Sequence, residues 1–227
     1  MGKRSKNIIN YQLQIKVIGF DLDQTLYPKS PEIDDAIQAY LYKEIADYKK
    51  VSLEEAEKMF KDLYLEGKGL SGSKSMEALG IPNGKEAVQI ALEKADIASF
   101  LKPDEEVLKL LKDLKIKYKN LDLITGSSKS IVDDKLREIG IKKSIFNNII
   151  TADEASKPDL SAFKMWFNFY PNLKPEQFLY IGDRPFSDFI APSSLGISVI
   201  LVNQKEKDSA LNCPQLESFV DLKKKLL

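Results

Sequence analysis

Residues 13–27 read LQIKVIGFDLDQTLY, a run of β-branched and apolar residues that ends in two aspartates, Asp21 and Asp23. Valine, isoleucine and phenylalanine favour extended backbone, so residues 13–20 are predicted to form a strand. Acidic side chains are costly near a core, and two of them at a strand end need a group that offsets their charge. Their spacing predicts that both side chains lie on one face if the strand continues.

Two neighbouring carboxylates repel each other unless a cation lies between them or one of them stays protonated. An ionised aspartate that is paired with a metal ion can attack phosphorus and form an aspartyl phosphate. A neighbouring aspartic acid with a raised pKa can protonate the leaving oxygen. The alternative is that the pair simply caps a turn, and the two residues taken alone favour this alternative.

Further short apolar runs alternate with amphipathic stretches along the chain. Predicted strands cover 121–125, 148–151, 178–181 and 197–202, and predicted helices cover 104–115, 128–139, 159–169 and 188–195. Strands that alternate with helices are typical of a parallel sheet that is covered by helices on both faces. The predicted fold class is therefore α/β, with a doubly wound parallel sheet.

Residues 32–100 interrupt this alternation because they contain only helical patterns. Predicted helices cover 33–48, 52–65, 73–79 and 84–95, and Ser52 with Glu55 forms a capping box for the second of them. We interpret 32–100 as a helical domain inserted into an α/β core of 1–31 and 101–227, with hinges near 28–31 and 100–103. The glycine-rich segment 67–72 is predicted to be a loop of this domain, and we hypothesise that it contacts substrate.

Chemically useful side chains follow three of the other predicted strands. Thr125 and Gly126 lie between a strand and a helix, where a hydroxyl and free N–H groups can bind an anion. Lys157 precedes a proline at a helix entrance, where it could neutralise phosphate charge. Asp183 and Asp188 follow the fourth strand and offer the oxygen ligands that Mg²⁺ prefers. Each feature alone is also ordinary, as a helix cap, a surface lysine or a turn.

The positions of these residues matter more than any one of them. All of them follow predicted strands on the carboxyl side, and in a parallel α/β sheet those strand ends share one edge where ligands bind. The sequence therefore predicts that the aspartates, the threonine and the lysine converge on one site.

Composition limits the chemistry of that site. The chain has no histidine, which excludes histidine bases, Ser-His-Asp triads and histidine-rich metal sites. The 34 basic and 34 acidic residues cancel, so no overall charge attracts nucleic acid or an anionic membrane. Lys3, Arg4, Lys6 and Lys16 are the exception, and we interpret them as a solvated terminus. With one cysteine, Cys213, and no long apolar run, a cytoplasmic location is the default expectation.

The order of these motifs resembles the haloacid dehalogenase-like superfamily over about residues 13–202. The matching residues are Asp21, Asp23 and Thr25, then Thr125, then Lys157, then Gly182, Asp183 and Asp188. The resemblance implies a Rossmann-like core, and it identifies 32–100 with the type-1 cap of that superfamily. The segment 21–28, the helical block and the stretch 64–67 look similar to the pyrimidine 5′-nucleotidase branch.

The resemblance also implies a role for each matching residue. Asp21 would be the nucleophile and a metal ligand, and Asp23 the acid and base, with a backbone carbonyl on the same Mg²⁺ ion. Thr125, the amide of Gly126 and Lys157 would hold the phosphoryl group. Asp183 would bind Mg²⁺ directly, with Asp188 as a ligand or its partner. The acid at position 23 points to phosphate-ester chemistry, since dehalogenase members lack it.

Two positions depart from the common pattern of the superfamily, Gly126 and Ser187, where many relatives carry asparagine. The expected function is hydrolysis of a small phosphorylated metabolite, such as a nucleotide or sugar phosphate. A phosphomutase on the same scaffold and a non-catalytic binding module remain alternatives. No nucleic-acid or membrane partner is expected, and the sequence leaves the oligomeric state open.

Overall fold

A computed structural model describes residues 14–28, 30–64, 70–95, 97–155, 157, 160–204 and 207–227 of the chain. The basic residues Lys3, Arg4 and Lys6 lie outside this part. The chain divides into two compact units, one formed by Met1–Pro28 with Leu101–Leu227 and the other by Lys29–Phe100. We call them the core unit and the helical unit, and each is described by itself.

Five parallel strands form the sheet of the core unit, in the order β3-β2-β1-β4-β5. They are β1 (Val17–Phe20), β2 (Asn120–Ile124), β3 (Asn148–Ile150), β4 (Phe178–Gly182) and β5 (Ser198–Leu201). The first strand lies in the centre, because β2 and β3 extend the sheet on one side of it and β4 and β5 on the other. The predicted doubly wound parallel sheet is confirmed.

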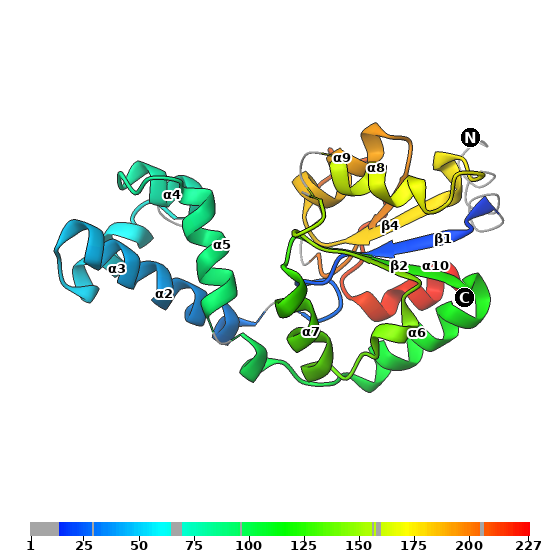
Figure 1. The fold of residues 1–227 in the computed structure, drawn as a ribbon, viewed down its shortest axis with the longest axis horizontal. Coiled ribbons are helices and arrows are strands. Elements are labelled where there is room, and N and C mark those ends of the chain that lie inside the picture. Colours follow the sequence, from blue (N-terminus) through cyan, green and yellow to red (C-terminus); the bar gives the residue numbers. More distant parts are fainter. Residues whose placement is uncertain are drawn as a thin grey trace. The chain divides into compact units, whose positions relative to one another are not determined.

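Helices cover both faces of this sheet (Figure 1). On one face lie α8 (Ser161–Asn168) and α9 (Ala191–Ser194), and on the other α6 (Glu105–Tyr118) and α10 (Lys223–Leu226). Helix α7 (Lys129–Glu138) and short 3-10 turns at Lys143–Ile145, Pro175–Gln177 and Phe219–Leu222 complete the unit. Gly19 lets α8 pack directly on the central strand, since a Cβ there would lie 2.7 Å from the Trp166 ring.

A fully buried carboxylate, Asp122, fixes that helix on the sheet. Asp122 Oδ2 accepts a hydrogen bond of 2.7 Å from Trp166 Nε1, and Oδ1 accepts bonds from the backbone and side-chain nitrogens of Asn148 at 2.8 and 2.9 Å. Buried polar groups are tolerated when they are hydrogen-bonded in this way. Asp122 therefore links β2 to β3 and to α8.

Asp122→Asn is expected to lower the free energy of unfolding by about 1–3 kcal/mol, because the new amide would turn an N–H toward the Trp166 N–H and leave it without an acceptor. Urea unfolding followed by the fluorescence of Trp166, the only tryptophan, measures this loss. The control is Asp134→Asn on the exposed face of α7, where about 0.5 kcal/mol or less is expected. Equal stability of the two variants would contradict the structural role of Asp122.

Several predicted boundaries shift. The strand expected at 13–20 begins at Val17, although Lys16 N still donates to Gln177 O at 2.8 Å, and Leu13 lies outside the described residues. The helix expected at 104–115 continues to Tyr118. The helix expected at 188–195 is present only in part: Ala191–Ser194 form α9, and a π-helical turn at Pro185–Ile190 precedes it. Pro192 has no N–H to continue a regular α-helix across this junction.

The helical unit contains α2 (Pro31–Lys49), α3 (Leu53–Lys61), α4 (Gly72–Ala78), α5 (Gly84–Lys94) and a 3-10 turn at Ala98–Phe100. It has its own apolar core, which includes Leu41, Ile45, Phe60, Met76 and Ala91. The predicted capping box is present, since Ser52 and Glu55 exchange hydrogen bonds. Residues 67–69, half of the predicted loop 67–72, lie outside the described residues, and Gly72 already belongs to α4.

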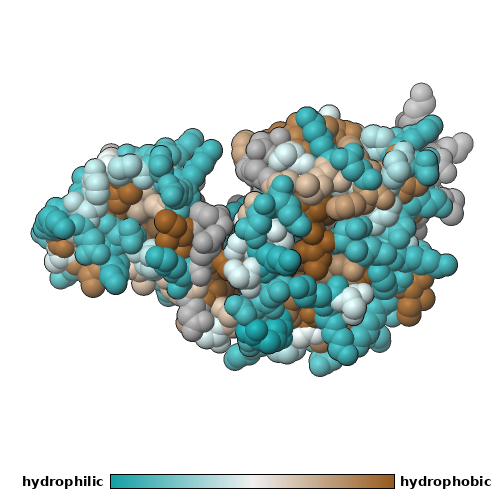
Figure 2. Space-filling model, in the orientation of Figure 1, coloured by the Kyte–Doolittle hydropathy of each residue, from teal (hydrophilic) through white to brown (hydrophobic). Residues whose placement is uncertain are grey.

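The faces of the two units that are visible in Figure 2 carry mainly hydrophilic residues, with apolar ones scattered among them. Within the described part of the chain, no helix combines the length and the apolar character needed to cross a membrane.

Candidate active site

The central strand delivers Asp21 to the carboxyl edge of the sheet. Asp21 N donates to Ile181 O at 2.8 Å, so the pairing of β1 with β4 continues to this residue. The side chain of Asp21 is buried, and Thr25 Oγ1 lies 3.3 Å from Asp21 Oδ2 as a hydrogen-bond donor. The site lies where the chain order of the sheet reverses around β1, the usual position of ligand sites in such sheets.

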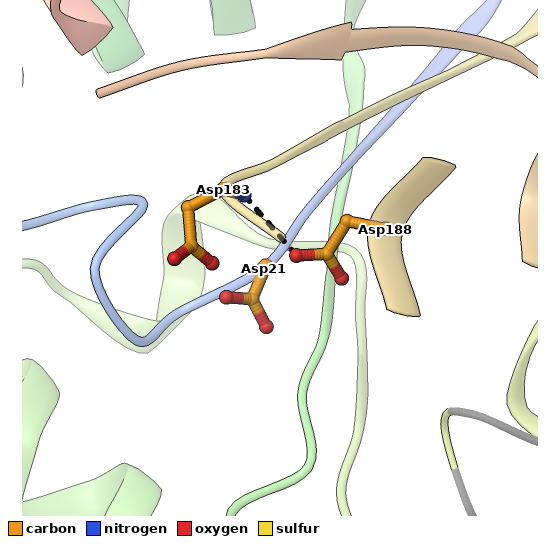
Figure 3. Close-up of side chains that lie close together, drawn as sticks. All are labelled: Asp21, Asp183 and Asp188. Carbon is orange, nitrogen blue, oxygen red and sulfur yellow. Dashed lines mark hydrogen bonds between the residues drawn. The ribbon is translucent and has the colours of Figure 1, made fainter. Parts of the chain in front are cut away.

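Three carboxyl groups meet at this edge (Figure 3). Asp21, Asp183 and Asp188 each offer one oxygen, and these three oxygens all lie within 4.8 Å of one another. Burial, with the charges of Asp188 and Asp23, raises the pKa of Asp21 to about 6. Burial, with the charge of Asp21, raises the pKa of Asp183 to about 8. Burial and mutual repulsion thus oppose the ionisation of Asp21 and Asp183 beside the third carboxylate, unless a cation is bound.

The donor set fits a divalent cation. Asp183 Oδ1 is buried and has no hydrogen-bond partner among the described residues, so its lone pairs are free for another ligand. Oxygen ligands from several carboxylates are those that Mg²⁺ and Ca²⁺ prefer. An acidic cluster able to hold a divalent metal ion is thus present at the position where the sequence predicted one.

Asp188 reaches this cluster because the preceding strand ends in a glycine. Asp188 Oδ2 accepts hydrogen bonds from the backbone N–H groups of Asp183 and Arg184, at 3.1 and 2.9 Å. A Cβ on Gly182 would lie only 2.4 Å from the Cβ of Asp188. The π-helical turn at 185–190 therefore folds the Asp188 carboxylate back onto the end of β4, and this requires glycine at position 182.

Lys157 neutralises part of the negative charge. Its ammonium group forms a buried ion pair with Asp21 Oδ1, and Asp188 Oδ1 lies 2.7 Å from the same nitrogen. The ammonium also lies 5.4 Å from the ring centroid of Tyr180, whose hydroxyl donates to Ile124 O. Burial opposes the charged lysine, but the two aspartates outweigh it and raise the pKa of Lys157 well above its usual range.

The carboxylate of Asp23 is bound by a second set of donors. Tyr27 Oη donates to Asp23 Oδ1 at 2.5 Å, and Ser127 Oγ donates to Oδ2 at 2.7 Å. Lys135 Nζ forms an ion pair with Oδ1. Burial alone would raise the pKa of Asp23, but Lys135 and the hydroxyl donors outweigh it and lower the pKa to about 2.

Two of the predicted phosphate-binding residues, Thr125 and Gly126, directly follow β2. Thr125 is fully buried, its N–H donates to Ile150 O at 3.0 Å, and its Oγ1 accepts from Ser127 N at 3.1 Å. Gly126 is exposed, and a Cβ there would meet no atom within 4 Å. The roles of Thr125 and the Gly126 amide in holding phosphate stay predictions.

The structure thus brings together Asp21, Lys157, Asp183 and Asp188. The Asp23 side chain is engaged with Lys135, and its backbone contact with a metal ion stays a prediction. Lys135, Ser127 and Tyr27 were not identified from the sequence. One signal was available: Lys135 shares the buried face of α7 with Val132, Leu136 and Ile139, where a lysine is unusual.

Comparison with known proteins agrees with this geometry. A family model described as haloacid dehalogenase-like hydrolase matches residues 18–202. The chain is 29% identical over 227 residues to the glyceraldehyde 3-phosphate phosphatase of Methanocaldococcus jannaschii, which covers 93% of this chain and 98% of the relative. It is 27% identical over 199 residues to the glyceraldehyde 3-phosphate phosphatase of Methanothermobacter thermautotrophicus, with 84% and 87% covered.

A solved structure shares the fold. The crystal structure of a phosphatase of this superfamily from Thermococcus onnurineus aligns with a TM-score of 0.65 and 19% sequence identity, covering 92% of this chain and 97% of the other. The chain belongs to the haloacid dehalogenase-like hydrolase family. Within that family it is a phosphatase, the activity for which both curated relatives are named.

Proposed function

We propose that this phosphatase is a Mg²⁺-dependent phosphomonoester hydrolase with Asp21 as its nucleophile. The observation that carries the proposal is the burial of Asp21 between Lys157 and the carboxylates of Asp183 and Asp188. A nucleophilic carboxylate needs a fixed position and a cationic environment for the phosphoryl group that it attacks. The core unit fixes the position of Asp21 and supplies the positive charge of Lys157, and a divalent cation on the acidic cluster would supply the rest.

In the first half of the proposed reaction, an Asp21 oxygen forms a bond to phosphorus while the ester P–O bond breaks. Asp23, whose pKa Lys135 lowers to about 2, first takes up a proton from solvent and then passes it to the leaving oxygen. In the second half, Asp23 accepts a proton from water, and the water oxygen attacks the phosphorus of the aspartyl phosphate. Inorganic phosphate leaves, and the Asp21 carboxylate is regenerated.

Charge neutralisation supports both steps. Asp21, Asp183 and Asp188 would hold a Mg²⁺ ion, which would supply positive charge for the phosphoryl oxygens. The ammonium of Lys157 supplies a second positive charge, and Thr125 with the Gly126 amide supplies neutral donors. The helical unit is proposed to act as the cap domain, in which the segment 64–75 contributes to substrate selection.

The substrate is proposed to be a small phosphorylated metabolite, with glyceraldehyde 3-phosphate as the first candidate because both curated relatives are named for it. The test is release of inorganic phosphate from glyceraldehyde 3-phosphate, a pyrimidine nucleoside 5′-monophosphate and a hexose phosphate, with and without Mg²⁺. Preference for the nucleotide would place the chain in the nucleotidase branch. Transfer of phosphate between sugar positions without its release would favour a phosphomutase instead.

Mg²⁺ is expected to stabilise the protein against thermal unfolding through the acidic cluster. A ligand at about 100 times its Kd adds about 2.7 kcal/mol to the free energy of unfolding. Asp183→Asn is expected to remove most of this gain because Asp183 supplies the unpaired oxygen, whereas Asp47→Asn on the exposed surface of α2 is expected to keep it. Thermal melts with and without Mg²⁺ measure the effect, and the same gain in both variants would place the ion elsewhere.

A further inference from the structure

Lys135 is a buried lysine outside the acidic cluster. It lies in the second half of α7, and its side chain is only 3% exposed. Removing an ammonium group from water costs several kcal/mol unless a partner of opposite charge and further acceptors compensate. Lys135 therefore needs partners on the otherwise apolar face of this helix.

The partners of Lys135 are the carboxylate of Asp23 and the hydroxyl of Ser127. Lys135 Nζ pairs with Asp23 Oδ1 and lies 3.3 Å from Ser127 Oγ. Ser127 Oγ in turn donates to the other oxygen, Asp23 Oδ2, at 2.7 Å. Both oxygens of one carboxylate are thus bound by groups from α7 and from the segment between β2 and α7. Such a triangle of contacts fixes the rotamer of Asp23.

The two lysines of the core site have separate tasks. Lys157 is paired with Asp21 and Asp188. The hydrogen bonds of the Lys135 ammonium among the described residues go to Asp23 and Ser127. The position of Asp23 therefore depends on α7 as well as on Tyr27, which donates to Asp23 Oδ1 at 2.5 Å, whereas the nucleophile is held by a different part of the core unit.

We propose that Lys135 is a positioning residue, which together with Ser127 holds the carboxylate of Asp23 in place for proton transfer. This inference rests on the proposed function, in which Asp23 serves the leaving oxygen and the attacking water. A displacement of about 1 Å in a catalytic group can cost about 10²-fold in rate. Lys135 therefore acts on turnover through Asp23 and not on substrate binding.

A double-mutant cycle with p-nitrophenyl phosphate tests this role. Lys135→Met is expected to lower kcat about 10–100-fold, because the neutral side chain no longer holds Asp23, and to leave KM within about twofold. In an Asp23→Asn background, the same substitution is expected to change kcat by about twofold or less, since residues that act through one group are not additive. The matched control is Lys129→Met, at the exposed start of the same helix.

The leaving group gives a second readout. Nitrophenolate leaves with little help from an acid, whereas an alkoxide needs a proton. Removing Lys135 also raises the pKa of Asp23, but if Lys135 acts by position the displacement of Asp23 outweighs this gain. Lys135→Met is therefore expected to cost more on an alkyl phosphate, such as glyceraldehyde 3-phosphate, than on p-nitrophenyl phosphate. Ser127→Ala is a smaller change. It is also expected to lower activity more on the alkyl phosphate than on p-nitrophenyl phosphate, and it replaces Lys135→Met in the test if that variant does not fold.

The outcomes separate this inference from the proposed function. Wild-type protein without phosphatase activity on either substrate would overturn both. An active wild type with equal losses on both substrates, or with additive losses in the cycle, would overturn the role of Lys135 alone. A larger loss on the alkyl phosphate together with a non-additive cycle would support the role of Lys135.

Discussion

Asp21→Asn is expected to lower kcat by about 10³-fold or more, because the amide cannot form the covalent bond to phosphorus that the carboxylate forms. The measurement is steady-state release of phosphate at saturating Mg²⁺. The substitution keeps the size of the side chain and removes one of three mutually repelling charges, so the fold is expected to survive it. Fluorescence of the buried Trp166 confirms the fold independently of activity.

The matched control is Asp47→Asn, an equally conservative change on the exposed surface of α2. It is expected to leave kcat unchanged. If Asp21→Asn keeps full activity in the same assay, Asp21 is not the nucleophile, and the acidic cluster would then serve only to bind the cation.

The second large effect is expected for Lys157→Met, which removes the internal cation of the acidic cluster. Breaking a buried ion pair by deleting one partner costs about 3–5 kcal/mol, because the other charge stays buried without compensation. Here two carboxylates, Asp21 and Asp188, lose the same partner. The free energy of unfolding is therefore expected to fall by about this amount, and kcat/KM by about 10²-fold or more.

Added Mg²⁺ distinguishes this loss from a packing defect. A divalent cation can replace the missing positive charge, so the ion is expected to stabilise Lys157→Met more than it stabilises the wild type. Urea unfolding with and without Mg²⁺ measures the difference. Lys164→Met, at an exposed position of α8, is the control and is expected to behave as the wild type. A loss of stability that Mg²⁺ does not reduce would contradict the electrostatic explanation.

The parallel sheet and the position of the acidic cluster could be predicted from the sequence. Short apolar runs that end in Asp21 and Asp183 carry a strong local signal, and the geometry of a parallel sheet then brings these ends together. Strand ends were less predictable: residues 14–16 have the composition of a strand, yet β1 begins only at Val17. Composition indicates which residues can pair, but tertiary packing decides how many do.

The environment of Asp23 could not be predicted in the same way. Lys135 is 112 positions away from Asp23 in the chain, and a lysine on a helix is usually solvated. Its pairing depends on how α7 packs, which no local pattern specifies. The π-helical turn at 185–190 was missed for a different reason: it is stabilised by the carboxylate of Asp188 reaching back to the amides of Asp183 and Arg184, a local contact that the spacing of apolar residues does not indicate.

The contact between Gly182 and Asp188 also limits how this chain can evolve. Any side chain at position 182 would place its first carbon 2.4 Å from Asp188, so a lineage that replaces this glycine must also give up the contact of Asp188 with the backbone amides. Gly126 faces open space and carries no such steric restriction. Substitutions are therefore sterically possible at position 126 and excluded at position 182, although both residues lie at the same edge of the sheet.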